Sequence, residues 1–136
     1  MKSFYTSVVR YGNSMLYRGY DASGQKIFRK EHFKPTFYIN SKKNTGWTGL
    51  DNNIISPVEL DSMREAKLWL EQYKDVQGVN IYGSQNYIHQ YITSKFPRDI
   101  EFERDKINVT TIDIETEYND GFPEPSEANQ KILAIT

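Results

Sequence analysis

Apolar and polar residues alternate through the first third of the chain and predict three short strands in succession. We expect strands over residues 4–11, 15–20 and 25–31, because each run is rich in aromatic or β-branched residues. Residues 12–14 and 21–24 contain the glycine, asparagine, aspartate and serine that are typical of turns. Strands joined by such short turns predict an antiparallel β-meander.

After the meander the pattern becomes irregular. Pro35 has no N–H to donate to a ladder, so it ends the meander, and residues 36–39 can form a further short strand. Residues 40–53 are polar and contain glycine, which predicts a long loop. Trp47 in this loop has two interpretations: it anchors the loop by packing, or it offers a ring on which a base can stack.

Helical spacing appears in the middle of the chain. Ser62 and Glu65 match a capping box ahead of apolar residues at helical spacing, so a helix is expected to begin there and to stop at Gly78. Residues 79–82 predict a strand, and the spacing of apolar residues over 86–96 favours a second helix.

A charged run over residues 101–106 indicates a domain boundary. Residues 1–105 are expected to form a mixed α+β domain built on the antiparallel meander with one or two helices, and residues 106–136 the start of a second domain. Within that second part, β-branched residues over 107–112 predict a strand, and residues 131–136 predict a second, apolar one.

Asp113 and Glu115 follow the first of these two strands. Alternation in a strand has a period of two, so both carboxylates should lie on one face. Such a pair can bind Mg²⁺ or Mn²⁺ through oxygen ligands, which suits phosphodiester hydrolysis by two metal ions. For this short pattern taken alone, a solvated strand end or a helix cap is the alternative.

Composition narrows the class of protein. The 136 residues are 38% hydrophobic and 26% charged, which is typical of one soluble globular domain. There is no apolar run long enough to cross a membrane and no signal peptide pattern at the N-terminus. Since there is no cysteine, disulfides and thiolate zinc sites are excluded, which fits a reducing cytoplasm. A P-loop is excluded because the Gly-Lys-Ser/Thr signature is absent.

The net charge of −1 hides a strong asymmetry. Residues 1–50 carry nine Lys or Arg and two acids, whereas residues 51–136 carry eight and sixteen. In the basic part, even spacing places basic side chains beside aromatic ones: Arg18 with Tyr20, and Lys26 and Lys30 with Phe28. Basic side chains can bind phosphates and aromatic rings can stack on bases, so this pattern predicts a surface that binds single-stranded nucleic acid. The alternative is a meander with its aromatic residues in the core and its lysines in solvent.

The C-terminal segment resembles the first exonuclease motif of family B DNA polymerases, in particular the replicative polymerases of T-even-type bacteriophages. This resemblance rests on Thr-Ile-Asp-Ile-Glu-Thr at 111–116, Asp-Gly-Phe-Pro-Glu-Pro-Ser at 120–126 and Ile-Leu-Ala-Ile-Thr at 132–136. Earlier segments also resemble the N-terminal domain of these enzymes; they are residues 1–5, 33–37 and 63–70.

The resemblance implies that residues 106–136 begin an RNase H-like exonuclease fold. By the same resemblance, Asp113 and Glu115 are the first two of four carboxylates that bind Mg²⁺ or Mn²⁺ in a proofreading 3′–5′ exonuclease. Phe122 would lie where the frayed primer end is received. In the family the other two carboxylates, the tyrosine that aligns water and the polymerase site lie downstream, so this chain alone is expected to be inactive.

The implied partners are single-stranded template and primer DNA, the polymerase's own messenger RNA, and the remainder of the polymerase. That remainder would be on the same chain or on a second polypeptide from a split gene. The resemblance implies the cytoplasm of an infected bacterial cell, with no membrane association. An isolated nucleic-acid-binding module without catalysis, which binds single-stranded DNA or represses translation of its own messenger, is the alternative function.

Overall fold

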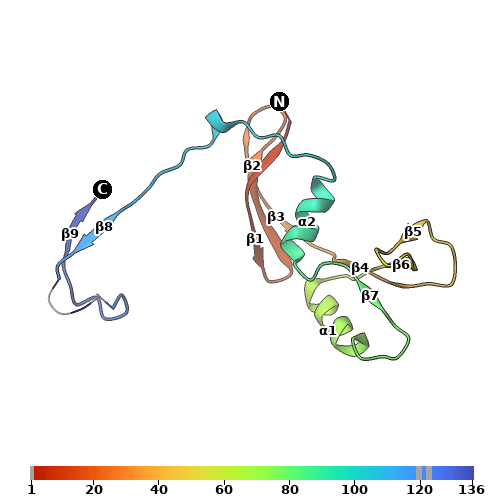
Figure 1. Cartoon of the computed structure of the whole chain (residues 1–136). Coiled ribbons are helices and arrows are strands. Elements are labelled where there is room, and N and C mark those ends of the chain that lie inside the picture. The colour runs from red at the N-terminus through yellow and green to blue at the C-terminus, as the bar shows by residue number, and fades with distance from the viewer. Residues whose placement is uncertain (1, 119–120, 122–123) are drawn as a thin grey trace. The chain divides into compact units, whose positions relative to one another are not determined.

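The computed structural model describes residues 2–118, 121 and 124–136, and its contacts divide the chain into two compact units, Met1–Phe102 and Glu103–Thr136. Antiparallel sheets and two α-helices make up the fold (Figure 1), so the predicted α+β class is confirmed. Among the described residues, no helix is long and apolar enough to cross a membrane.

The predicted meander is present in the first unit. It consists of β1 (Phe4–Tyr11), β2 (Ser14–Tyr20) and β3 (Lys26–His32), in the order β1-β2-β3. The predicted boundaries are correct to within one residue, because the turns are encoded locally. Gly12, for example, has a φ of 60° in the two-residue turn between β1 and β2, a conformation that glycine adopts without strain.

A β-bulge lies in β1 between Tyr5 and Ser7. Opposite the bulge, Gly19 of β2 is pressed against β1, and a Cβ there would overlap the carbonyl oxygen of Phe4. Because backbone atoms rather than a flexible side chain fill that space, only glycine fits this position without a shift of the strands.

A second sheet has the order β5-β6-β4-β7. Its strands are β4 (Thr36–Asn40), β5 (Trp47–Thr48), β6 (Ile54–Glu59) and β7 (Ile81–Tyr82). The sequence did not predict β6, since Pro57 lies in its middle and argues against a strand. In the structure β5 pairs only with Ile54 and Ile55, so Pro57 lies where β6 has a single neighbour, β4. The loop predicted over 40–53 therefore contains a strand, β5.

The helices are α1 (Met63–Tyr73) and α2 (Tyr87–Lys95). The predicted start of α1 is confirmed: the Ser62 hydroxyl accepts a hydrogen bond from the backbone N–H of Glu65 at 3.0 Å. The predicted end at Gly78 was wrong, because Lys74 is the C-cap and residues 74–78 are exposed. These residues bury no apolar side chain, so continued helix would gain no packing energy there.

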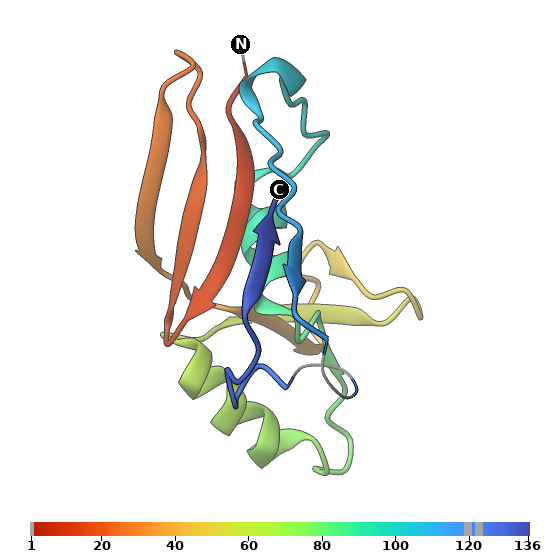
Figure 2. The same cartoon turned by 90° about the vertical axis from the view of Figure 1, so that its left-hand side faces the viewer.

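The core of the first unit lies between the two helices, one face of the meander and the second sheet (Figures 1 and 2). Aromatic rings fill much of it. The Phe37 ring lies 6.0 Å from the Trp69 ring and 6.4 Å from the Tyr87 ring, and Phe33 lies 5.6 Å from Tyr91. The buried cluster consists of Met15, Tyr17, Phe33, Phe37, Leu60, Met63, Ala66, Tyr87 and Tyr91.

The second unit contains a short 3₁₀ turn (Arg104–Lys106) and a hairpin of β8 (Ile114–Thr116) and β9 (Ile132–Ile135). The predicted apolar strand is confirmed as β9. The strand predicted over 107–112 was wrong: these residues form no ladder with another described strand, and the hairpin begins at Asp113, which exchanges backbone hydrogen bonds with Thr136. High β-propensity without a partner strand does not make a strand.

Candidate nucleic-acid interface and metal ligands

One face of the meander gathers the basic and aromatic residues that the sequence singled out, except Tyr20, which is buried and stacks on Phe4. The β2–β3 register pairs Arg18 with Phe28 and Tyr20 with Lys26. Lys30 lies two residues beyond Phe28 on the same side of β3. Arg18, Lys26, Phe28 and Lys30 are all exposed, so the structure brings the four predicted residues of this unit together on one open surface.

Two cation–π contacts cross this surface. The Arg18 guanidinium lies 5.4 Å from the centre of the Phe28 ring, and the Lys30 ammonium lies 4.9 Å from the centre of the Tyr11 ring. Both rings remain open to solvent, with Phe28 61% and Tyr11 62% exposed. The contacts hold the cations beside the rings without covering the rings.

Tyr11 is a member of this surface that sequence reasoning missed. The signal was available: the register across the two-residue turn pairs Tyr11 with Ser14, which lies on the same side of β2 as Arg18. Counting alternation through the turn would have placed Tyr11 there. Below, "the sheet face" means Tyr11, Arg18, Lys26, Phe28 and Lys30.

The opposite face of β3 has a structural role. The Glu31 carboxylate accepts a hydrogen bond from the Tyr91 hydroxyl at 2.9 Å and pairs with the Lys95 ammonium at 2.6 Å. Burial acts to raise the pKa of Glu31, but the hydrogen bonds from Lys95 and Tyr91 bring that pKa below its ordinary value. Burial and the bond to Glu31 raise the pKa of Tyr91 well above its ordinary value. These groups attach α2 to the meander.

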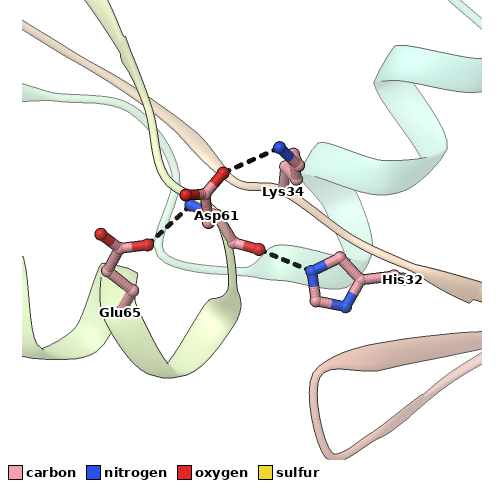
Figure 3. Close-up of polar contacts among 4 residues, drawn as sticks. All are labelled: His32, Lys34, Asp61 and Glu65. Carbon is pink, nitrogen blue, oxygen red and sulfur yellow. Dashed lines mark hydrogen bonds and ion pairs between the residues drawn. The ribbon is translucent and has the colours of Figure 1, made fainter.

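A polar cluster connects the start of α1 to the end of β3 and the residues after it (Figure 3). The His32 Nε2 donates to the carbonyl oxygen of Asp61 at 2.5 Å, and the Lys34 ammonium binds the Asp61 carboxylate at 2.8 Å. Glu65 accepts from the Asp61 backbone N–H at 2.8 Å. The hydrogen bond with Lys34 lowers the pKa of Asp61. Since every group shown has a partner within the cluster, it serves to hold two elements together.

The carboxylate pair lies on the hairpin of the second unit. Asp113 and Glu115 are exposed, and Glu115 lies opposite Ala134 in the β8–β9 register. The donor chemistry suits a hard cation, but the number of donors does not: among the described residues, no group of three or more potential ligands converges. Two carboxylates do not complete a magnesium site, so no catalytic step follows from these residues alone. Phe122 lies outside the described residues.

Comparison with known proteins identifies the class to which this chain is related. No family model matches it. The chain is 30% identical over 138 residues to the DNA-directed DNA polymerase of Escherichia phage RB69, and 29% identical over 136 residues to that of Enterobacteria phage T4. Both matches cover the whole chain and 15% of the length of the relative.

The relatives are thus phage DNA polymerases. More particularly, the chain is homologous from end to end to the N-terminal region of the T4- and RB69-type family B enzymes. The predicted resemblance is confirmed at this level.

Proposed function

We propose that this chain is the N-terminal part of a replicative DNA-directed DNA polymerase with a 3′–5′ proofreading exonuclease. The observation that carries the proposal is similarity along the whole chain to two phage DNA-directed DNA polymerases, of whose length the chain spans about 15%. In this assignment, residues 1–105 form the N-terminal domain and residues 106–136 begin the exonuclease domain.

The hairpin supplies the first exonuclease motif. Asp113 and Glu115 would contribute two of the carboxylates that hold Mg²⁺ or Mn²⁺ in the intact enzyme, and the rest of the polymerase would supply the others. The hairpin also exposes apolar side chains: Ile114, Ile132, Leu133 and Ile135 are each more than half exposed. Such a surface favours association with the remainder of the exonuclease domain.

The test combines this chain with a polypeptide that supplies the rest of a related phage polymerase, a 3′-mismatched primer-template and Mg²⁺. We expect excision of the mismatched nucleotide from the mixture, and its loss with Asp113→Ala or Glu115→Ala. Glu103→Ala, which removes a carboxylate of the same unit outside the hairpin, is the matched control and should excise normally.

Co-elution of the two polypeptides is measured separately. If they associate and excise equally well with both hairpin variants, the metal-ligand assignment is wrong. If they associate and never excise, the exonuclease proposal is wrong.

A second function, single-stranded nucleic-acid binding, is favoured by the sheet face. Its three cations can neutralise phosphates, while Phe28 and Tyr11 offer open rings for bases. Template DNA and the polymerase's own messenger RNA are both single strands that this chemistry suits. Fluorescence anisotropy with labelled thymidine and uridine oligonucleotides tests it: binding by the chain alone supports the function, and its absence at low salt contradicts it.

A further inference from the structure

A second basic surface of the first unit lies away from the sheet face. It is an open groove of about 760 Å³, bordered by α1, β7, the start of α2 and the inward-facing side of β1. This volume is in the range of binding sites rather than of packing defects. Arg10, Lys67, Lys74 and Glu71 supply its charged groups.

The basic side chains that line the groove outnumber the acidic ones. The Lys74 ammonium lies 2.7 Å from the Glu71 carboxylate and lowers the pKa of that carboxyl, but its side chain is 55% exposed and an ammonium has three donors, so it can also bind a ligand carboxylate. Among the described residues, neither Arg10 nor Lys67 has a carboxylate within ion-pair distance. The Arg10 guanidinium is fixed in place 5.3 Å above the Tyr87 ring, and its Nε donates to the carbonyl oxygen of Gly12 at 3.2 Å. The groove therefore has a net charge of +2 and complements an anionic ligand.

The apolar part of the groove offers aliphatic surface rather than rings. Phe37 is fully buried and Tyr87 is 9% exposed, so neither can stack on a base. The partly exposed apolar residues are Leu70, Val79 and Ile81. This chemistry differs from that of the sheet face, where the rings of Phe28 and Tyr11 are more than 60% exposed. Single-stranded nucleic acid, which gains affinity from stacking, is poorly matched to the groove.

The spacing of the lysines favours an extended ligand over a single phosphate group. Lys67 lies within α1 and Lys74, seven residues on, is its C-cap with helical dihedral angles, which places their Cα atoms about 10 Å apart along the helix axis. A peptide in the extended polyproline II conformation has three residues per turn and a rise of about 3.1 Å per residue, so its residues i and i+3 lie on one side about 9 Å apart. Carboxylates along such a peptide can reach both positions, with aliphatic side chains between them on the floor.

We propose that this groove binds an acidic, leucine-containing segment of a partner protein. Its carboxylates pair with Lys67, Lys74 and Arg10, and its aliphatic side chains pack on Leu70 and Ile81. The proposal rests on the groove alone and stands apart from the polymerase assignment.

The test uses the full chain and a fluorescein-labelled peptide that repeats aspartate-leucine-leucine, with binding followed by anisotropy. Lys67→Ala should weaken binding about threefold, and the Lys67→Ala/Lys74→Ala variant about tenfold, as exposed charge pairs contribute. Lys67 is exposed within α1 and Lys74 is exposed at its C-cap, so neither substitution removes a buried contact and the fold should be kept. Lys42→Ala, which removes an exposed lysine of the segment between β4 and β5 that belongs to neither surface, is the matched control and should bind the peptide normally.

Two further ligands keep the proposal open to refutation. A lysine-leucine repeat peptide should not bind, and a thymidine oligonucleotide should bind Lys67→Ala as well as it binds the unsubstituted chain. Equal binding of the acidic peptide to the double variant overturns the proposal. A loss of oligonucleotide affinity in Lys67→Ala as large as the loss of peptide affinity also overturns it, since the groove would then accept any polyanion.

Discussion

Replacement of single cations on the sheet face should change the salt dependence of single-strand binding by a predictable amount. Arg18, Lys26 and Lys30 are exposed on this face and can each neutralise one phosphate. Each such contact contributes about −0.7 to the slope of log K against log salt concentration, so the unsubstituted chain should have a slope of about −2. Between 50 and 200 mM salt, affinity should then fall about 20-fold.

Lys26→Ala should reduce that loss to about sevenfold, because one contact is removed. Lys26 is the best single choice, since Arg18 and Lys30 also make cation–π contacts whose loss could disturb the face. Phe28→Ala should act differently. It removes an uncharged ring, so it should weaken binding by about 1–3 kcal/mol for each stacked base and leave the salt slope unchanged.

The assay is fluorescence anisotropy of a labelled thymidine oligonucleotide, titrated at several salt concentrations. Lys42→Ala removes the same charge from an exposed position in the segment between β4 and β5, so it is the matched control for Lys26→Ala. Equal changes of slope for the two variants would show that net charge, rather than the sheet face, determines binding. An unchanged affinity for Phe28→Ala would refute stacking on this ring.

Three further substitutions test the packing of the first unit, with thermal or urea unfolding as the measurement. Phe37→Ala should lower the free energy of unfolding by about 3–5 kcal/mol, because the ring is fully buried; a loss below 1 kcal/mol would contradict the described core. Glu31→Gln should destabilise most near neutral pH. The pKa of Glu31 is lowered in the folded protein, so its carboxylate stabilises the fold at pH values above the ordinary pKa of 4.5. This stabilisation is lost as the pH falls through the folded-state pKa. A difference in unfolding free energy between Glu31→Gln and the unsubstituted chain that does not change with pH would contradict this. Gly19→Ala should destabilise by about 1–3 kcal/mol, since its Cβ would overlap backbone of β1, and a neutral effect would argue against the bulge.

Features encoded by neighbouring residues could be predicted from the sequence. The meander follows from alternation and from turns such as that at Gly12, and the start of α1 follows from the pairing of Ser62 with Glu65. The same alternation placed Phe28 on one face of its strand with Lys26 and Lys30, and the register then made Arg18 and Phe28 direct neighbours. In each case the necessary information lies within a few residues of the feature.

Features that depend on a distant partner could not be predicted. The strand expected over 107–112 has suitable residues but no pairing strand in the described part of the chain, whereas β6 forms in spite of Pro57 because β4 lies beside it. The basic groove is a similar case, since Arg10 and Lys67 come from elements that meet only in the folded chain. The roles of Asp113 and Glu115 stay predictions, because the ligands that would complete their site are not among the described residues.

The register of β1 determines which chemistry each surface presents. Arg10 pairs with Met15 on the side of the core and lies over Tyr87, whereas Tyr11, the next residue, pairs with Ser14 and lies under Lys30. Because side chains alternate along a strand, a shift of the β1–β2 pairing by one residue would exchange the faces on which Arg10 and Tyr11 lie. The groove would then lose its arginine and the sheet face would lose its tyrosine ring. The bulge opposite Gly19 fixes this register near the start of the strand and the turn at Gly12 fixes it at the end. A substitution such as Gly19→Ala should therefore weaken both peptide and oligonucleotide binding, although Gly19 belongs to neither surface.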